Sequence, residues 1–265
     1  SEVYVGGDFT LIGPQTGPWA RVDAAGAVTA PQPVEGGFVY EAVSDGAGGW
    51  FIAGDFDSVG GIPQPRLAHV LPDGKLDRRW RPTVNGVVTA LERRGATLYV
   101  GGTFTKFAGQ PRSLLAAVDI RKRSLTTWKP VISGRKKSDD VYVTDLALAP
   151  DGRALYVAGY FWRVGGKRRA NLAAVDTGSA AAVTSWRPAV DGGVALLAVD
   201  PRGRAVYAAG DFGQAGGKPR AGLAALHPRT GSALRWDPDP DGEVSVILPG
   251  PSGSPVYLGG SFASI

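Results

Sequence analysis

The chain repeats one short phrase six times, and this repetition constrains the fold more than any other feature. Each copy is an apolar run followed by a small pair, one variable residue and Phe: VYVGGDF, WFIAGDF, LYVGGTF, LYVAGYF, VYAAGDF and VYLGGSF. The closing residues are Phe9, Phe56, Phe104, Phe161, Phe212 and Phe262, at intervals of 47, 48, 57, 51 and 50 residues. A period of this length indicates a repeat architecture.

A second marker, Trp-x-Pro, follows the same period. It begins at Trp80, Trp128, Trp186 and Trp236, with intervals of 48, 58 and 50 residues. Both markers lengthen in the same interval, so one insertion, read as ISGRKKSDDVY, explains both.

The pattern inside one period is strand after strand. Between Val143 and Pro188, VTDLALAP alternates apolar and polar residues, DGR turns, and ALYVAGYF, NLAAVDT and AAVTSW follow with Gly-rich or polar turns between them. Helical periodicity is absent, and 39 Gly and 20 Pro are spread along the chain. Four antiparallel strands in 40–50 residues are typical of a β-propeller blade, so we predict an all-β propeller.

The sequence is compatible with two numbers of blades. The chain starts and ends on a second strand, and EVSVILPG near the C-terminus could pair with the first strands to close five blades. The alternative is a segment of a propeller with six or more blades. We predict a single domain over 1–265, with repeats at about 1–37, 38–85, 86–140, 141–192, 193–242 and a partial repeat at 243–265.

Composition excludes several classes of protein. The absence of Cys excludes disulfides and thiolate chemistry, and no apolar run reaches the 18–20 residues of a membrane span. The net charge is +5, but acidic and basic residues alternate, so we expect no nucleic-acid partner. The only histidines, His69 and His227, lie in different repeats, and we expect neither a metal site nor a cofactor. The chain lacks Met, so we expect a processed product or an excised piece.

Strand order places the loops after the second strands and the links between blades on one face, the loop-rich face. Two polar positions recur there. The first stands between Gly and Phe and is an acid in three copies: Asp8, Asp55 and Asp211. The second lies in the following loop and is Arg in three copies: Arg112, Arg169 and Arg220. These residues either bind a polar ligand such as a glycan or cap turns and pair within their own blades.

The tryptophans divide into two groups. The four of Trp-x-Pro recur with the repeat, so we expect them to pack between blades. Trp162 breaks the pattern, beside Tyr160 and close to Lys167–Arg169, and the insertion with Arg135–Asp140 enters the same face. We therefore predict that Trp162 is the aromatic contact of a ligand site.

The composite pattern Gly-x-Phe, Gly-Gly, Pro-Arg, Leu-Ala also occurs as GDFDSVGGIPQPRLA, GTFTKFAGQPRSLLAAVD and GDFGQAGGKPRAGLAAL. It resembles the delta-60-repeat β-propeller family, a bacterial domain of unknown function, over nearly the whole chain. The resemblance implies a propeller, often within large exported or surface proteins. It implies no activity.

We therefore expect a non-catalytic binding or display module, extracellular or at the cell surface, that recognises a glycan or a protein. Neighbouring domains of a longer chain are expected. One alternative is an enzyme acting on polysaccharide or glycan with channel carboxylates as acid and base. A structural spacer is the other.

Overall fold

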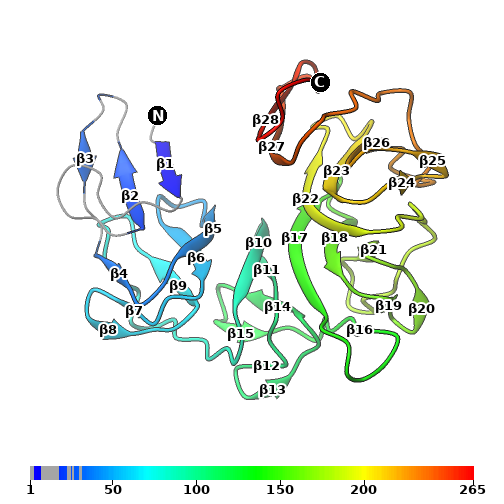
Figure 1. The fold of residues 1–265 in the computed structure, drawn as a ribbon. Coiled ribbons are helices and arrows are strands. Elements are labelled where there is room, and N and C mark those ends of the chain that lie inside the picture. The colour runs from blue at the N-terminus through cyan, green and yellow to red at the C-terminus, as the bar shows by residue number, and fades with distance from the viewer. Residues whose placement is uncertain (1–2, 7–17, 23–24, 26, 30–31) are drawn as a thin grey trace. The chain divides into compact units, whose positions relative to one another are not determined.

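A computed structural model describes residues 3–6, 18–22, 25, 27–29 and 32–265 (Figure 1). All regular elements of this described part are β-strands, which confirms the all-β prediction. Helices long and apolar enough to cross a bilayer do not occur in it. Asp8 and Phe9 lie outside the described residues.

The chain forms two compact units, which we describe separately. Unit 1 comprises Ser1–Arg112 and Ala116–Thr126. Its first sheet is β1 (Val3–Gly6), β2 (Trp19–Val22) and β3 (Val28–Thr29). The second is β5 (Val39–Ser44), β6 (Trp50–Gly54) and β9 (Leu67–Val70), and the third is β10 (Val88–Arg94), β11 (Thr97–Gly102), β14 (Leu115–Asp119) and β15 (Ser124–Leu125).

Unit 2 comprises Ser113–Leu115 and Thr127–Ile265. It contains the sheets β17 (Tyr142–Leu148), β18 (Ala154–Tyr160) and β21 (Leu172–Asp176), then β22 (Gly193–Val199), β23 (Val206–Asp211) and β26 (Leu223–Leu226). A last pair, β27 (Val244–Pro249) and β28 (Val256–Gly260), follows. Within each sheet the strands pair antiparallel in chain order, as in propeller blades.

The prediction of four-stranded blades holds for one sheet, β10-β11-β14-β15. In three other sheets the fourth strand is reduced to a single bridge: Val70 to Leu76, Val175 to Val183 and Leu226 to Ala233. Each of these segments soon reaches Trp-x-Pro, and Pro has no N–H to continue a ladder. The outermost strand is therefore shorter than its sequence suggested.

The strand expected to complete the N-terminal sheet pairs inside its own unit. β27 lies antiparallel to β28, with Leu248 opposite Tyr257. These two strands therefore form a two-stranded sheet, and the number of blades in the ring stays a prediction.

The repeated small pair in the phrase has a structural cause. In five repeats the first strand bulges one or two residues after its start, opposite the end of the second strand. A Cβ on Gly102 would lie 2.1 Å from the carbonyl oxygen of Val87, and the equivalent glycines would come within 1.9–2.3 Å of theirs: Gly54, Gly159, Gly210 and Gly260. Only Gly allows the two backbones to approach this closely.

The Phe and Trp of the two markers lie in the core. Phe56 and Phe104 are fully buried, and Trp80, Trp128 and Trp186 are at most 3% exposed. The indole N–H groups of Trp128 and Trp186 donate to carbonyls of the following blade, at Asp176 and His227. The prediction that the tryptophans pack between blades is confirmed for these three, whereas Trp236 is only partly buried, against Tyr207 and Ile247.

Candidate functional site

Short hairpins follow the second strands in each unit (Figure 1). β7 (Ser58–Val59) and β8 (Ile62–Pro63) pair with β4 (Val34–Glu35), and β19 (Arg163–Val164) and β20 (Lys167–Arg168) pair with β16 (Ile132–Ser133). β12 (Lys106–Phe107) with β13 (Gln110–Pro111), and β24 (Gln214–Ala215) with β25 (Lys218–Pro219), are equivalent hairpins. The loop after a second strand therefore lies beside the link that precedes its blade, as predicted.

One side chain of the link fixes each such loop. Asn85, Asp191 and Asp241 each accept two backbone N–H groups of the loop through Oδ1, at 2.7–3.0 Å. These hydrogen bonds hold the pKa of Asp241 below its usual value. The acidic run at Asp237–Gly242 thus follows the pattern of an interblade link, and the described residues hold no cluster of three or more metal-ligating side chains.

The acidic position of the phrase has different roles in different repeats. Asp55 accepts the N–H of Phe38 at 2.6 Å and the Tyr40 hydroxyl at 2.8 Å, so it caps the start of β5. Thr103 does the same for the N–H of Val87. Asp211 is exposed, and its carboxylate has no hydrogen-bond partner in the described part of the chain.

The recurrent Arg is a structural clamp. Nη1 donates to the preceding residue's carbonyl and Nη2 to a carbonyl near the end of the blade, 14 or 15 residues later: Arg112 to Thr126, Arg169 to Thr184 and Arg220 to Leu234. Where the repeat has Gln64 instead, Arg81 reaches Gln64 and the carbonyl of Pro63. Both Nη atoms of each Arg thus donate to the blade, while Nε is buried without a partner in all three, so a ligand can be met only by the second hydrogens of the Nη atoms.

The phrase position also contributes to a hollow in unit 2, which we term the inner hollow. It has a volume of about 540 Å³ and lies at the ends of β18 and β23 and the start of β27. Tyr160, Asp211 and Glu243 are exposed at it, over a floor that includes Phe212 and Val244. The Glu243 carboxylate, like that of Asp211, has no partner among the described side chains.

The Tyr160 ring is held in place by its surroundings. It lies against Tyr142, with 4.8 Å between ring centroids, and across the backbone of Gly193, where a Cβ would come 2.1 Å from Cζ. Tyr160 is 38% exposed. The inner hollow therefore combines a positioned aromatic ring with two free carboxylates. In the sequence, Tyr160 stands at the position that Asp211 fills in the next repeat and beside Trp162, whereas no pattern points to Glu243.

Trp162 and the insertion come together, as predicted. The guanidinium carbon of Arg135 lies 3.7 Å from the centroid of the Trp162 ring, and that of Arg168 lies 4.3 Å from it. Asp139 accepts the backbone N–H groups of Arg135 and Lys136 and so shapes the insertion. The indole is thus engaged in cation–π contacts, and a sugar would have to displace a guanidinium to stack on it.

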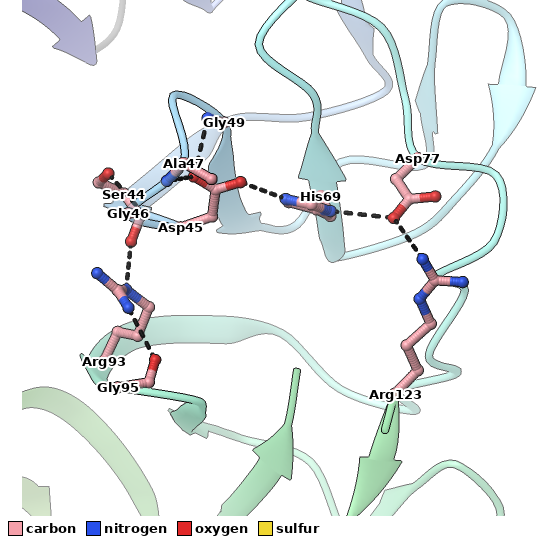
Figure 2. Close-up of polar contacts among 10 residues, drawn as sticks. All are labelled: Ser44, Asp45, Gly46, Ala47, Gly49, His69, Asp77, Arg93, Gly95 and Arg123. Atoms are coloured by element: carbon pink, nitrogen blue, oxygen red, sulfur yellow. Dashed lines mark hydrogen bonds and ion pairs between the residues drawn. The ribbon is translucent and has the colours of Figure 1, made fainter. Parts of the chain in front are cut away.

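The His69 ring lies between two carboxylates, beside the tight turn that joins β5 to β6 (Figure 2). Its Nε2 is 3.1 Å from Asp45, in the turn after β5, and its Nδ1 is 3.1 Å from Asp77, after β9. Arg123 lies 3.8 Å from Asp77. Each ring nitrogen thus faces one carboxylate, and backbone N–H groups of Ala47, Gly49 and Arg79 donate to the other oxygen of these two aspartates.

The match to a known family agrees with the resemblance found in the sequence. Residues 48–79 match the family described as "Domain of unknown function (DUF5122) beta-propeller". A search of curated proteins gave no match to this chain.

Solved structures share the fold at low identity. The chain is 11% identical to the Cps50 (Swd1) β-propeller domain of Myceliophteria thermophila, with a TM-score of 0.53, covering 86% of this chain and 65% of that one. It is 13% identical to the extracellular domain of the putative one component system BT4673 from B. thetaiotaomicron, with a TM-score of 0.51, covering 84% of this chain and 25% of that one. The chain thus spans about a quarter of one relative and just under two thirds of the other. These likenesses show a β-propeller fold.

Proposed function

We propose that this β-propeller is a non-catalytic binding module and that its inner hollow takes a ligand with several hydroxyl groups, such as a glycan. The observation that carries the proposal is the placement of Tyr160 beside the free carboxylates of Asp211 and Glu243. Carboxylates accept hydrogen bonds from sugar hydroxyls, and an exposed aromatic ring packs on a sugar face. The volume is within the range of small-ligand sites.

A glycan-acting enzyme is the second candidate, because Asp211 and Glu243 lie in one hollow. A glycosidase needs one carboxyl in an apolar surrounding that keeps it protonated, beside a second that stays ionised. Asp211 and Glu243 are both exposed to solvent, which favours binding over hydrolysis. From the family resemblance we further propose an extracellular or cell-surface location within a longer chain, with protein ligands and a spacer role as alternatives.

Binding to a glycan array tests the proposal. We expect Tyr160→Ala and Asp211→Asn each to weaken binding about tenfold or more, because few contacts carry most of the binding energy. The Asp211 side chain is exposed, so the melting temperature of Asp211→Asn should stay the same, and melting curves show whether Tyr160→Ala, which loses its packing on Tyr142, has stayed folded. Tyr257→Ala, which removes a more exposed ring from β28, is the control.

Three results would contradict this proposal. Equal loss of binding in Tyr257→Ala would show that the inner hollow is not the site. Shortened glycan products that disappear in Asp211→Asn would support the enzyme. Lack of binding to every glycan on the array would leave a protein ligand or a spacer.

A further inference from the structure

A second hollow of unit 2, the outer hollow, lies on the loop-rich face between β20 and the link that follows Trp186. Its volume is about 360 Å³, and Arg168, Arg169 and Arg187 line it. Asp191 also lines it, but Oδ1 of Asp191 accepts the backbone N–H groups of Gly213 and Gln214. Three arginines therefore line one small space, and the charge of Arg187 acts on Arg169 there.

In the next blade, the Arg at the position equivalent to Arg169 is neutralised by a carboxylate. Arg220, the counterpart of Arg169, is 6% exposed and donates to Asp237 at 2.8 Å. Asp237 directly follows Trp236 of Trp-x-Pro. A carboxylate supplied by the chain thus completes the surroundings of Arg220.

In the blade before it, that carboxylate is replaced by a cation. The residue that directly follows Trp186 is Arg187, so the position of Asp237 carries a positive charge. Burial and the charge of Arg187 both lower the pKa of Arg169. Within the described chain, Arg168, Arg169 and Arg187 form no ion pair with an acid.

More cations surround the outer hollow. Arg168 is shared between the hollow and the Trp162 ring, over which Arg135 also lies. Exposed cations continue outward on the insertion and the β19–β20 hairpin: Lys136, Lys137, Arg163 and Lys167. Asp139 directs one oxygen to backbone N–H groups. The positive surface is therefore larger than a single small anion would need.

We propose that the outer hollow binds the carboxylate of an acidic polysaccharide, which takes the place that Asp237 fills in the next blade, with Arg187 and Arg169 as its main partners. Guanidinium groups bind carboxylates through charge-assisted hydrogen bonds in a fixed geometry. Arg135 and the lysines contact further carboxylates along the polymer. A nucleic acid fits less well, because it needs free aromatic faces for its bases and the Trp162 ring already carries guanidinium groups. This site is separate from the inner hollow and goes beyond the function proposed for it.

Binding of polygalacturonate oligomers to the whole chain at physiological ionic strength tests this inference. Arg187→Asp, which reproduces the residue of the next blade, is expected to weaken binding about tenfold or more, the effect of losing a charge-assisted hydrogen bond. Arg187→Gln should also weaken it. Arg202→Asp makes the same charge change at an exposed position on the β22–β23 turn and should stay within about twofold.

Ligand controls separate the carboxylate from the sugar backbone. Methyl-esterified oligomers of the same length have no charge and should not bind at the outer hollow. The inner hollow is tested with neutral glycans and Tyr160→Ala, whereas this inference is tested with the charge of polygalacturonate and Arg187→Gln, so the two can fail independently.

Four outcomes would overturn the inference. These are equal losses in Arg187→Asp and Arg202→Asp, undiminished binding in Arg187→Gln, equal affinity for the methyl ester, and tighter binding of duplex DNA than of polygalacturonate. Melting curves identify a variant that has not folded, and Arg187→Gln then carries the test.

Discussion

Gly102→Ala is expected to lower the free energy of unfolding by about 3 kcal/mol, at the upper end of the cost of overpacking. The new Cβ would lie 2.1 Å from the carbonyl oxygen of Val87. Backbone atoms on both sides cannot yield as the tip of a flexible side chain can, so the bulge between β10 and β11 must open. The expected fall in melting temperature is roughly 6–12 °C, measured by calorimetry or circular dichroism.

Gly213→Ala is the control for this substitution. A Cβ there would meet Oδ2 of Asp191 at 3.6 Å, an ordinary contact, and Gly213 is exposed. Its effect should be within about 0.5 kcal/mol. A melting temperature of Gly102→Ala equal to that of Gly213→Ala would show that the close approach does not require Gly.

The repeat was predictable because its cause is the same in every copy. The bulge at the first strand, the Gly opposite it and the buried Phe recur in register, so the geometry of one copy applies to the others. Trp-x-Pro was predictable for the same reason, since each Trp fills a similar space between blades. Strand number was overestimated because Pro and the turn before it shorten the outer strand.

The candidate site was only partly predictable, because the same residue type at an equivalent position has different hydrogen-bond partners in different repeats. Asp55 accepts hydrogen bonds from the N–H of Phe38 and the hydroxyl of Tyr40. The equivalent of Tyr40 near Asp211 is Ala195, which has no hydroxyl to donate. The signal was in the first strand and not in the phrase. Likewise, Arg187 and Asp237 differ at one position after Trp, and that difference separates a neutralised Arg from an unneutralised one.

His69→Gln is expected to destabilise unit 1 by about 2 kcal/mol, because two mostly buried carboxylates lose the hydrogen bonds of the ring and Phe51 loses its stacked neighbour. The side chains of Asp45 and Asp77 are only 10% and 9% exposed, and each lies 3.1 Å from the ring (Figure 2). The ring also stacks on Phe51 at 4.4 Å between centroids. His227→Gln, in the other unit, changes a ring that only accepts backbone N–H groups and is the matched control.

The pH dependence of this variant separates the charge from the packing. Burial alone would raise the pKa of both carboxyls, but hydrogen bonds from backbone amides and from His69 outweigh it, so both pKa values lie below 3.8. A lowered carboxyl pKa stabilises the folded state above the unfolded pKa, and this stabilisation is lost as pH falls through the folded pKa. In His69→Gln the carboxylates lack the hydrogen bonds of the ring, so their pKa values are lowered less, and less of this stabilisation is present in the variant than in the original protein. The difference in melting temperature should therefore be large at pH 7 and smaller near pH 3.5. A difference that stays constant between these two pH values would mean that His69 stabilises unit 1 through its stacking on Phe51 alone.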